Sequence, residues 1–244
     1  MEAAGPRRAR SVAAKQERER AILDAARALG TERSVREVTL TDIAAAVGLH
    51  KSAMLRYFET REQIFLALTA EGWREWSAAL RGALEAPAEP TPEPAPGPAP
   101  APGPAPAPTA APAPAPGPAP GAVAAVLARS LVDRPFFCDL LAQAPLNLER
   151  NVSLDAATAF KKVVLAEVAE VRTVLCDLLG VTERQAVDVI STATGMAGAL
   201  WQMAAPGSRL RELYETHPEL AHAVVEVEPQ LTRILTALLT GMRS

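Results

Sequence analysis

A proline-rich segment at residues 86–121 divides the sequence into two parts. Sixteen of its 36 residues are proline, most of them at alternate positions, and 12 are alanine. Because each proline lacks a backbone donor and restricts the residue before it, neither a packed helix nor a strand tolerates this spacing. We therefore predict a flexible linker, extended or disordered. A ligand for a partner domain is the less favoured alternative, because no basic anchor lies beside the repeat.

The sequence on both sides of this linker shows helical periodicity, without alternating strand patterns or Asn-Gly turns. The pattern predicts a first helix at residues 12–29, which ends at Gly30, and a short third helix at residues 51–58. Capping signals precede other helices at Thr39 with Asp42, Thr60 with Gln63, and Thr182 with Gln185.

The stretch from Thr39 to Phe65 predicts two short helices joined by a tight turn. Gly48 accepts a positive φ at the turn, and Ala44 is small where the two helices must touch. The apolar anchors of the hidden side are Ile43, Val47, Leu49, Met54 and Phe58. The opposite face then carries Lys51, Ser52, Leu55, Arg56 and Glu59. Arginine binds guanine edges or phosphates and leucine contacts thymine methyls, so this face favours a DNA-binding helix-turn-helix over a structural corner.

These patterns together predict an all-α protein with an N-terminal three-helix helix-turn-helix domain and a C-terminal helical domain. The predicted parts are a basic N-terminal arm at 1–11, the DNA-binding domain with its linking helix at 12–85, the linker at 86–121, and the helical domain at 122–244.

Charge is unevenly distributed along the chain. The net charge is −3, yet residues 1–60 carry 11 Lys and Arg against 8 Asp and Glu, whereas residues 121–244 carry 11 against 14. A mildly basic first part is compatible with a DNA-binding module joined to a module of another kind. We find no export signal and no apolar run of ~20 residues, and we expect Cys138 and Cys176 to be buried free thiols. We therefore expect a cytoplasmic protein that does not bind a membrane.

Sequence motifs for catalysis or metal binding are missing. His217 and His222 are five residues apart and do not share a helix face. No His-Glu-x-x-His, Cys-x-x-Cys or phosphate-binding glycine loop occurs. We expect no enzymatic activity, no metal site and no cofactor.

The stretch LTDIAAAVGLHKSAMLRYFETREQIF resembles the DNA-binding signature of TetR-family transcriptional regulators. The positions that match the family pattern include Thr39, Ile43, Ala44, Gly48 and Phe58. The family usually has serine where His50 stands and tyrosine where Leu55 stands. The resemblance covers about residues 12–80 and implies a ligand-responsive homodimer, usually a repressor, whose third helices enter successive major grooves of a near-palindromic operator.

The resemblance also implies which residues contact double-stranded DNA. Thr39 and Arg61 would touch phosphates, and Tyr57 would hydrogen-bond the DNA backbone. Thr41, Lys51, Ser52 and Arg56 would approach base edges, and Lys51 could also reach a phosphate. The predicted DNA-binding residues are Thr39, Thr41, His50, Lys51, Ser52, Leu55, Arg56, Tyr57 and Arg61.

The C-terminal part is expected to bind an effector and to form the dimer. The helix predicted at 182–204 is rich in alanine and glycine, and the last helix, from Pro229, is broadly apolar, so we expect one subunit not to cover both. We predict an unidentified, small and largely apolar effector, because polar groups are few among the candidate lining residues. These candidates are Phe136, Phe137, Phe160, Met196, Trp201 and Met203.

The linker interrupts a connection between domains that is direct in the family. We hypothesise that the fourth helix docks non-covalently on the C-terminal domain through Trp73, Trp76, Leu80 and Leu84. The alternative to a regulator is an all-helical interaction or small-molecule carrier protein, whose helix-turn-helix is only structural.

Overall fold

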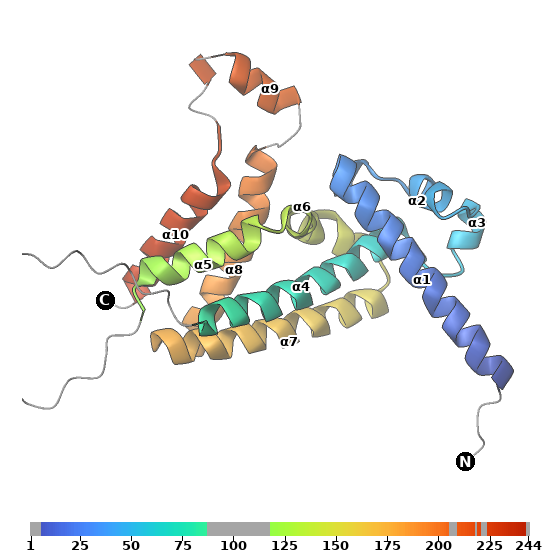
Figure 1. Ribbon diagram of the computed structural model, residues 1–244, viewed down its shortest axis with the longest axis horizontal. Helices are drawn as coiled ribbons and strands as arrows, with labels where there is room; N and C mark the ends of the chain where they lie inside the picture. Colours follow the sequence, from blue (N-terminus) through green and yellow to red (C-terminus); the bar gives the residue numbers. More distant parts are fainter. Residues whose placement is uncertain (1–5, 87–117, 205–208, 218, 221–223, 243–244) are drawn as a thin grey trace, which may run out of the picture.

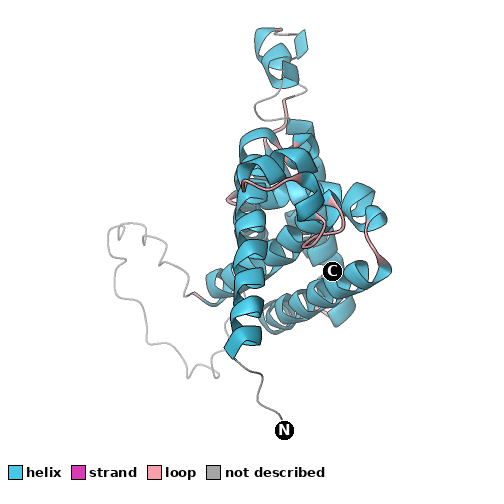
Figure 2. Ribbon diagram, turned by 90° about the vertical axis from the view of Figure 1, so that its right-hand side faces the viewer, coloured by secondary structure: helices cyan, strands magenta, loops and turns pink. Residues whose placement is uncertain are grey.

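The computed structural model describes residues 6–86, 118–204, 209–217, 219–220 and 224–242. Within these ranges every regular element is a helix and none is a strand, which confirms the predicted fold class (Figure 2). The elements before the proline-rich segment are α1 (Pro6–Arg33), η1 (Val35–Glu37), α2 (Leu40–Ala46), α3 (Lys51–Met54) and α4 (Arg61–Glu85). Those after it are α5 (Pro120–Val132), α6 (Pro135–Gln143), η2 (Ala144–Leu148), η3 (Glu149–Asn151), α7 (Leu154–Leu179), α8 (Glu183–Ala204), α9 (Arg209–Thr216) and α10 (Val227–Met242).

Helix α1 starts earlier and ends later than the sequence predicts. It includes residues 6–11 of the predicted basic arm, and it runs through Gly30 to Arg33. The prediction of a helix stop at Gly30 is wrong, because this glycine serves close packing instead. A Cβ atom there would lie 2.6 Å from Cε2 of Phe136 in α6, a separation that real side chains do not tolerate.

The structure confirms the predicted helix caps, except that one side-chain bond at α4 has a different partner. Thr39 and Asp42 form a complete capping box at α2, and Thr182 with Gln185 does the same before α8. At α4, the Gln63 N–H donates to Thr60 Oγ1 at 3.1 Å as predicted. The Gln63 side chain, however, accepts from the N–H of Glu59, one residue earlier, at 2.7 Å.

Helix α4 is the central element that joins the two parts of the molecule. It lies alongside α7 and also contacts α1, α5 and α6 (Figure 1). Trp76 is fully buried, and its Nε1 donates to Ser130 Oγ of α5 at 2.9 Å. The rings of Trp73 and Phe137 of α6 pack in a T-shaped arrangement with their centroids 5.9 Å apart. Leu80 is also buried. The predicted docking of the fourth helix on the later helices is therefore confirmed, although Leu84 is only half-buried.

Among the helices after α4, α6 packs on α8 and α5 packs on α10. On α10, Leu231, Leu235 and Leu239 are buried within the chain, so one subunit covers more of this helix than the sequence suggested. Ile234 and Leu238 stay half-exposed. Most of the proline-rich segment, residues 87–117, lies outside the described residues, and α5 begins with Pro120 in its first turn. None of the described helices is long and apolar enough to cross a membrane.

Both cysteines are free, and they differ in environment. Cys138 is buried, as expected, and its thiol donates to the Leu131 carbonyl. Burial, with a smaller effect from the neighbouring Asp139, raises the pKa of this thiol to about 12. Cys176 is only half-buried.

Candidate nucleic-acid interface

Helix α3 is shorter than predicted but is firmly positioned at both ends. Gly48 has the predicted positive φ of 65°, and His50 caps the helix by accepting the N–H of Ser52 on Nδ1. The regular helix ends at Met54 instead of Phe58. After Met54 the chain continues as turns whose hydrogen bonds span three residues instead of four. The Arg56 N–H donates to the Ala53 carbonyl at 3.3 Å, and the Tyr57 N–H donates to the Met54 carbonyl at 2.9 Å.

The hidden side of α2 and α3 is anchored as the sequence predicts. Ile43, Ala44, Met54 and Phe58 are all buried, and they belong to the same core as the buried residues of α1 and α4. Full burial of a side chain as large as those of Ile43, Met54 and Phe58 contributes roughly 1.5–3 kcal/mol. These anchors on α2, on α3 and in the turns after α3 therefore hold two short helices that would not be stable alone.

The opposite side presents a compact polar surface, which we call the reading face: Lys51, Ser52, Leu55 and Arg56. All four side chains are exposed, and Leu55 keeps 52% of its surface in contact with solvent. Next to this face, Ser52 Oγ lies 3.0 Å from His50 Nδ1. A solvent-exposed leucine between cations has no partner in the described part of the chain to explain it structurally.

Thr39 and Thr41 are exposed at the start of α2, on the approach to the same surface. Thr39 is also engaged in its cap, because its hydroxyl donates to Asp42 Oδ2 at 2.7 Å. These hydrogen bonds from Thr39 lower the pKa of the Asp42 carboxyl. Tyr57 is half-buried, behind the exposed residues.

Arg61 lies apart from the other predicted DNA contacts. Its guanidinium donates to the carbonyls of Val35 and Val38 and lies 4.8 Å from the centre of the Phe65 ring. A third bond reaches Glu62 at 3.1 Å, and only 14% of the side chain is exposed. The structure thus uses Arg61 inside the domain, where it braces the segment that leads into α2.

Two cavities lie where the first four helices meet the later ones. One, of about 300 Å³, opens between α4 and α7 and includes Phe58, Arg74 and Phe160 in its lining. The other, of about 270 Å³, lies between α1, α4 and α6. Its walls combine Leu68, Phe136, Phe137 and Leu140 with the polar side chains of Arg27, Thr31, Glu75 and Arg134. We call it the junction cavity.

Comparisons with known proteins agree over both parts of the chain. Residues 105–244 match the family of tetracyclin repressor-like C-terminal domains, and residues 22–68 match the bacterial regulatory proteins of the tetR family. The chain belongs to the TetR family. It is therefore a transcriptional regulator with a helix-turn-helix DNA-binding domain, as the sequence resemblance implied.

Two solved structures of regulators share the fold. The fatty acid degradation regulator FadR of Bacillus halodurans aligns with a TM-score of 0.51 at 12% identity, over 91% of this chain and 97% of that chain. FadR of Thermus thermophilus, a TetR-family repressor in complex with lauroyl-CoA, aligns with a TM-score of 0.52 at 17% identity, over 91% and 93%. No curated protein matches the sequence.

The six effector candidates of this TetR regulator do not come together in one place. Phe136 and Phe137 line the junction cavity, and Phe160 lines the cavity between α4 and α7. Met196 and Trp201 are half-buried on α8 and line neither cavity. Met203 also lines neither, and 56% of its surface is exposed. Sequence periodicity gives the inner side of each helix but not which inner sides face the same space.

Sequence reasoning missed Asp139 of this regulator. Its side chain is only 4% exposed, although aspartate is almost never buried. Oδ2 accepts the Val35 N–H at 2.7 Å, and Oδ1 accepts Nε2 of Gln202 at 2.8 Å. Burial raises the pKa of this carboxyl, against the opposing effect of the two hydrogen bonds and of Arg61. The available signal was a lone carboxylate within the apolar run PFFCDLL.

Proposed function

We propose that the chain is a repressor that binds a near-palindromic operator as a homodimer and is released by a small molecule. The observation that carries the DNA-binding proposal is the reading face, which exposes Lys51 and Ser52 on α3 and Leu55 and Arg56 directly after it, while the opposite side is anchored in the core. A helix anchored on one side in this way leaves its other side free to enter a major groove. A carrier protein with a structural helix-turn-helix would have no use for an exposed leucine there.

The residues of the reading face have different proposed tasks. Arg56 forks onto a guanine edge or a phosphate, Lys51 binds phosphate or a base edge at the start of α3, and Leu55 contacts a thymine methyl. Ser52 and Thr41 approach base edges, and the remaining contacts at the rim are Thr39, His50 and Tyr57. We leave Arg61 out of the direct contacts because its guanidinium is already bonded inside the domain.

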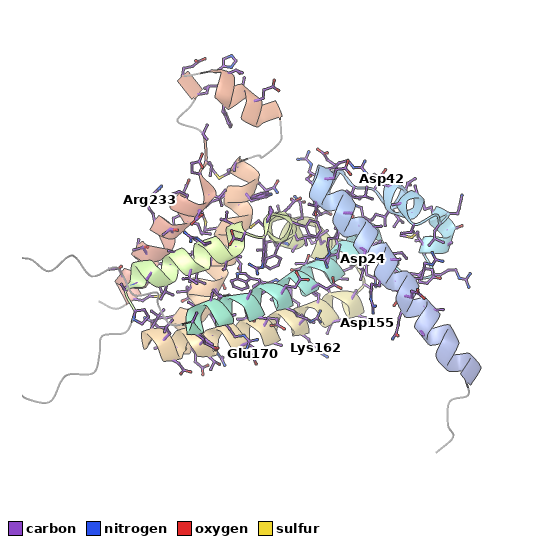
Figure 3. All side chains as sticks on the ribbon, viewed as in Figure 1. Asp24, Asp42, Asp155, Lys162, Glu170 and Arg233 are labelled. Carbon is purple, nitrogen blue, oxygen red and sulfur yellow. The ribbon has the colours of Figure 1, made fainter. Side chains whose placement is uncertain are left out.

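The test measures binding to the DNA that flanks the protein's own gene, by fluorescence anisotropy across a salt series. We expect Arg56→Ala to weaken binding roughly 10- to 100-fold, as the loss of one bidentate base contact does. Lys51→Ala should weaken binding to all sequences and reduce the salt slope by about 1. Lys162→Ala is the matched control, since this exposed lysine lies on the outer side of α7, far from α3 (Figure 3).

Failure of the wild-type protein to bind this DNA at low salt would favour the carrier alternative. Equal affinities of Arg56→Ala and Lys162→Ala would show that the reading face does not contact DNA.

We further propose that the junction cavity is the effector site. It is lined by two of the predicted effector residues, Phe136 and Phe137, and it touches both the DNA-binding domain and the C-terminal domain. Arg27 is paired with Glu71 at 2.6 Å and lies 3.7 Å from Glu75. Arg134, at the uncapped N-terminus of α6, donates from Nη1 to the Ser130 carbonyl at 2.6 Å but has no carboxylate partner within the described residues.

These features predict an effector with an apolar body and one acidic group. The aromatic rings would cover the apolar body, and Arg134 with the start of α6 would hold the acid, because helix N-termini favour anions. The volume of about 270 Å³ limits the bound part to a small molecule.

The effector site is tested with dodecanoate and, as a neutral counterpart, dodecanol. We expect calorimetry to detect dodecanoate binding, and Arg134→Ala to weaken it at least fivefold by removing a charge-assisted contact. Arg150→Ala, at an exposed arginine outside the cavity, is the control. Equal binding of both compounds, or equal binding by both variants, would contradict the proposed acid-binding role of the cavity.

A further inference from the structure

The Asp139 carboxylate connects three elements of the two domains. It projects from α6, accepts the Val35 N–H of η1 with one oxygen and binds the Gln202 amide of α8 with the other. Within the described residues it has no ion-pair partner, and it is held by these hydrogen bonds instead. A buried carboxylate that forms no direct ion pair is expensive to keep, so a plain packing role is better served by an apolar residue.

The segment from Val35 to Val38, which Asp139 binds at Val35, is also hydrogen-bonded on its other side. Arg61 of α4 donates to the Val35 carbonyl and to the Val38 carbonyl. Val35 therefore has its N–H bonded to α6 and its C=O bonded to α4. Helix α2 begins at Leu40, directly after this segment, so any displacement of Val35 shifts the start of the helix-turn-helix.

The geometry points to Asp139 as a positioning residue that transmits the state of α6 and α8 to the helix-turn-helix through the Val35 amide. For its regulatory meaning, this inference rests on the proposed function. Phe136, Phe137 and Leu140 of α6 line the junction cavity, and Asp139 stands among them on the same short helix. A shift of α6 by about 1 Å would lengthen the 2.7 Å bond beyond the hydrogen-bonding range.

The test is a double-mutant cycle that needs neither DNA nor effector, read out as hydrogen exchange of the Val35 amide. Asp139→Ala should accelerate this exchange at least tenfold, because it removes a hydrogen bond to a charged acceptor. Gln202→Ala should accelerate it by roughly threefold, although Gln202 does not touch Val35, because the carboxylate loses its second tether. In the double variant, the Gln202 change should add nothing.

Asp139→Asn guards against simple unfolding. Its amide oxygen can still accept the Val35 N–H, and its NH₂ group can donate to a reoriented Gln202 amide. We expect its Val35 exchange rate to lie between those of the wild type and Asp139→Ala. Ser191→Ala, at an exposed residue of the same helix α8, is the matched control for Gln202 and should leave the rate unchanged.

The inference is overturned if Gln202→Ala leaves the exchange rate of the Val35 amide unchanged. It is also overturned if the acceleration in the double variant equals the product of the two single accelerations. A merely structural role of Asp139 would produce either of these results. The DNA titration of the wild-type protein decides the proposed function separately. If the cycle shows coupling but the protein does not bind DNA, the repressor proposal is rejected and the positioning role of Asp139 stands. If the protein binds DNA but the cycle shows no coupling, the repressor proposal stands and the positioning role is rejected.

Discussion

Two glycines set how closely α6 approaches the DNA-binding domain. A Cβ atom at Gly30 of α1 would meet the Phe136 ring at 2.6 Å, and one at Gly72 of α4 would meet the Phe137 ring at 2.4 Å. The adjacent residues Phe136 and Phe137 of α6 thus pack on Gly30 of α1 and Gly72 of α4. The missing side chains are what allow Asp139, two residues after Phe137, to reach Val35.

The residue-scale prediction compares two glycines of α4. Gly72→Ala should destabilise the protein by about 1–3 kcal/mol, because the new methyl group overpacks against Phe137. Gly82→Ala should stabilise it by about 0.5–1 kcal/mol, because nothing lies within 4 Å of its Cβ position and alanine favours helix. Urea unfolding measures both. Similar effects of the two substitutions would contradict the close approach at Gly72.

At the scale of single elements, the sequence predicted best what local chemistry decides. The box at Thr39, the cap at Thr60, the turn at Gly48 and the buried side of α2 and α3 follow from neighbours within four residues. The predicted ends of α1 and α3 were wrong for two different reasons. Phe136 makes Gly30 a packing position, and tight turns replace the last turn of α3 while Phe58 still enters the core.

The candidate site divides in the same way. The reading face lies opposite the locally spaced anchors Met54 and Phe58, so Lys51, Ser52, Leu55 and Arg56 are exposed as predicted. The brace at Arg61 and the Asp139 bonds join residues between 23 and 104 positions apart, and no local pattern records such pairs. For the same reason the effector candidates were scattered, since the rotation of each C-terminal helix depends on its partners.

At the scale of the whole molecule, α8 has an open face suited to a second subunit. Gly195 and Ala199 are exposed there, and no atom lies within 4 Å of a Cβ built at Gly195. Small side chains allow helices to approach closely, and a symmetric pair would place two reading faces on successive major grooves. Ile234 and Leu238, half-exposed on α10, are the candidates to extend this contact.

The whole-molecule prediction concerns this dimer. Sedimentation of the wild-type protein should give twice the chain mass of 25.7 kDa. Ala199→Glu should give the monomer mass, because the interface would have to bury an unpaired carboxylate. Ala166→Glu, at an exposed alanine of α7, should remain dimeric. A dimeric Ala199→Glu variant would place the interface elsewhere.

The docking of α4 by its side chains has a consequence for how the two domains stay together. Trp73, Trp76 and Leu80 hold α4 against the later helices, so we predict that the peptide connection between Glu85 and Pro120 serves only as a tether. A tether contributes through effective concentration, and doubling the length of a flexible one costs only about 0.6 kcal/mol. Insertions and deletions in the proline-rich tract should therefore be nearly neutral, whereas substitutions on the inner face of α4 should not.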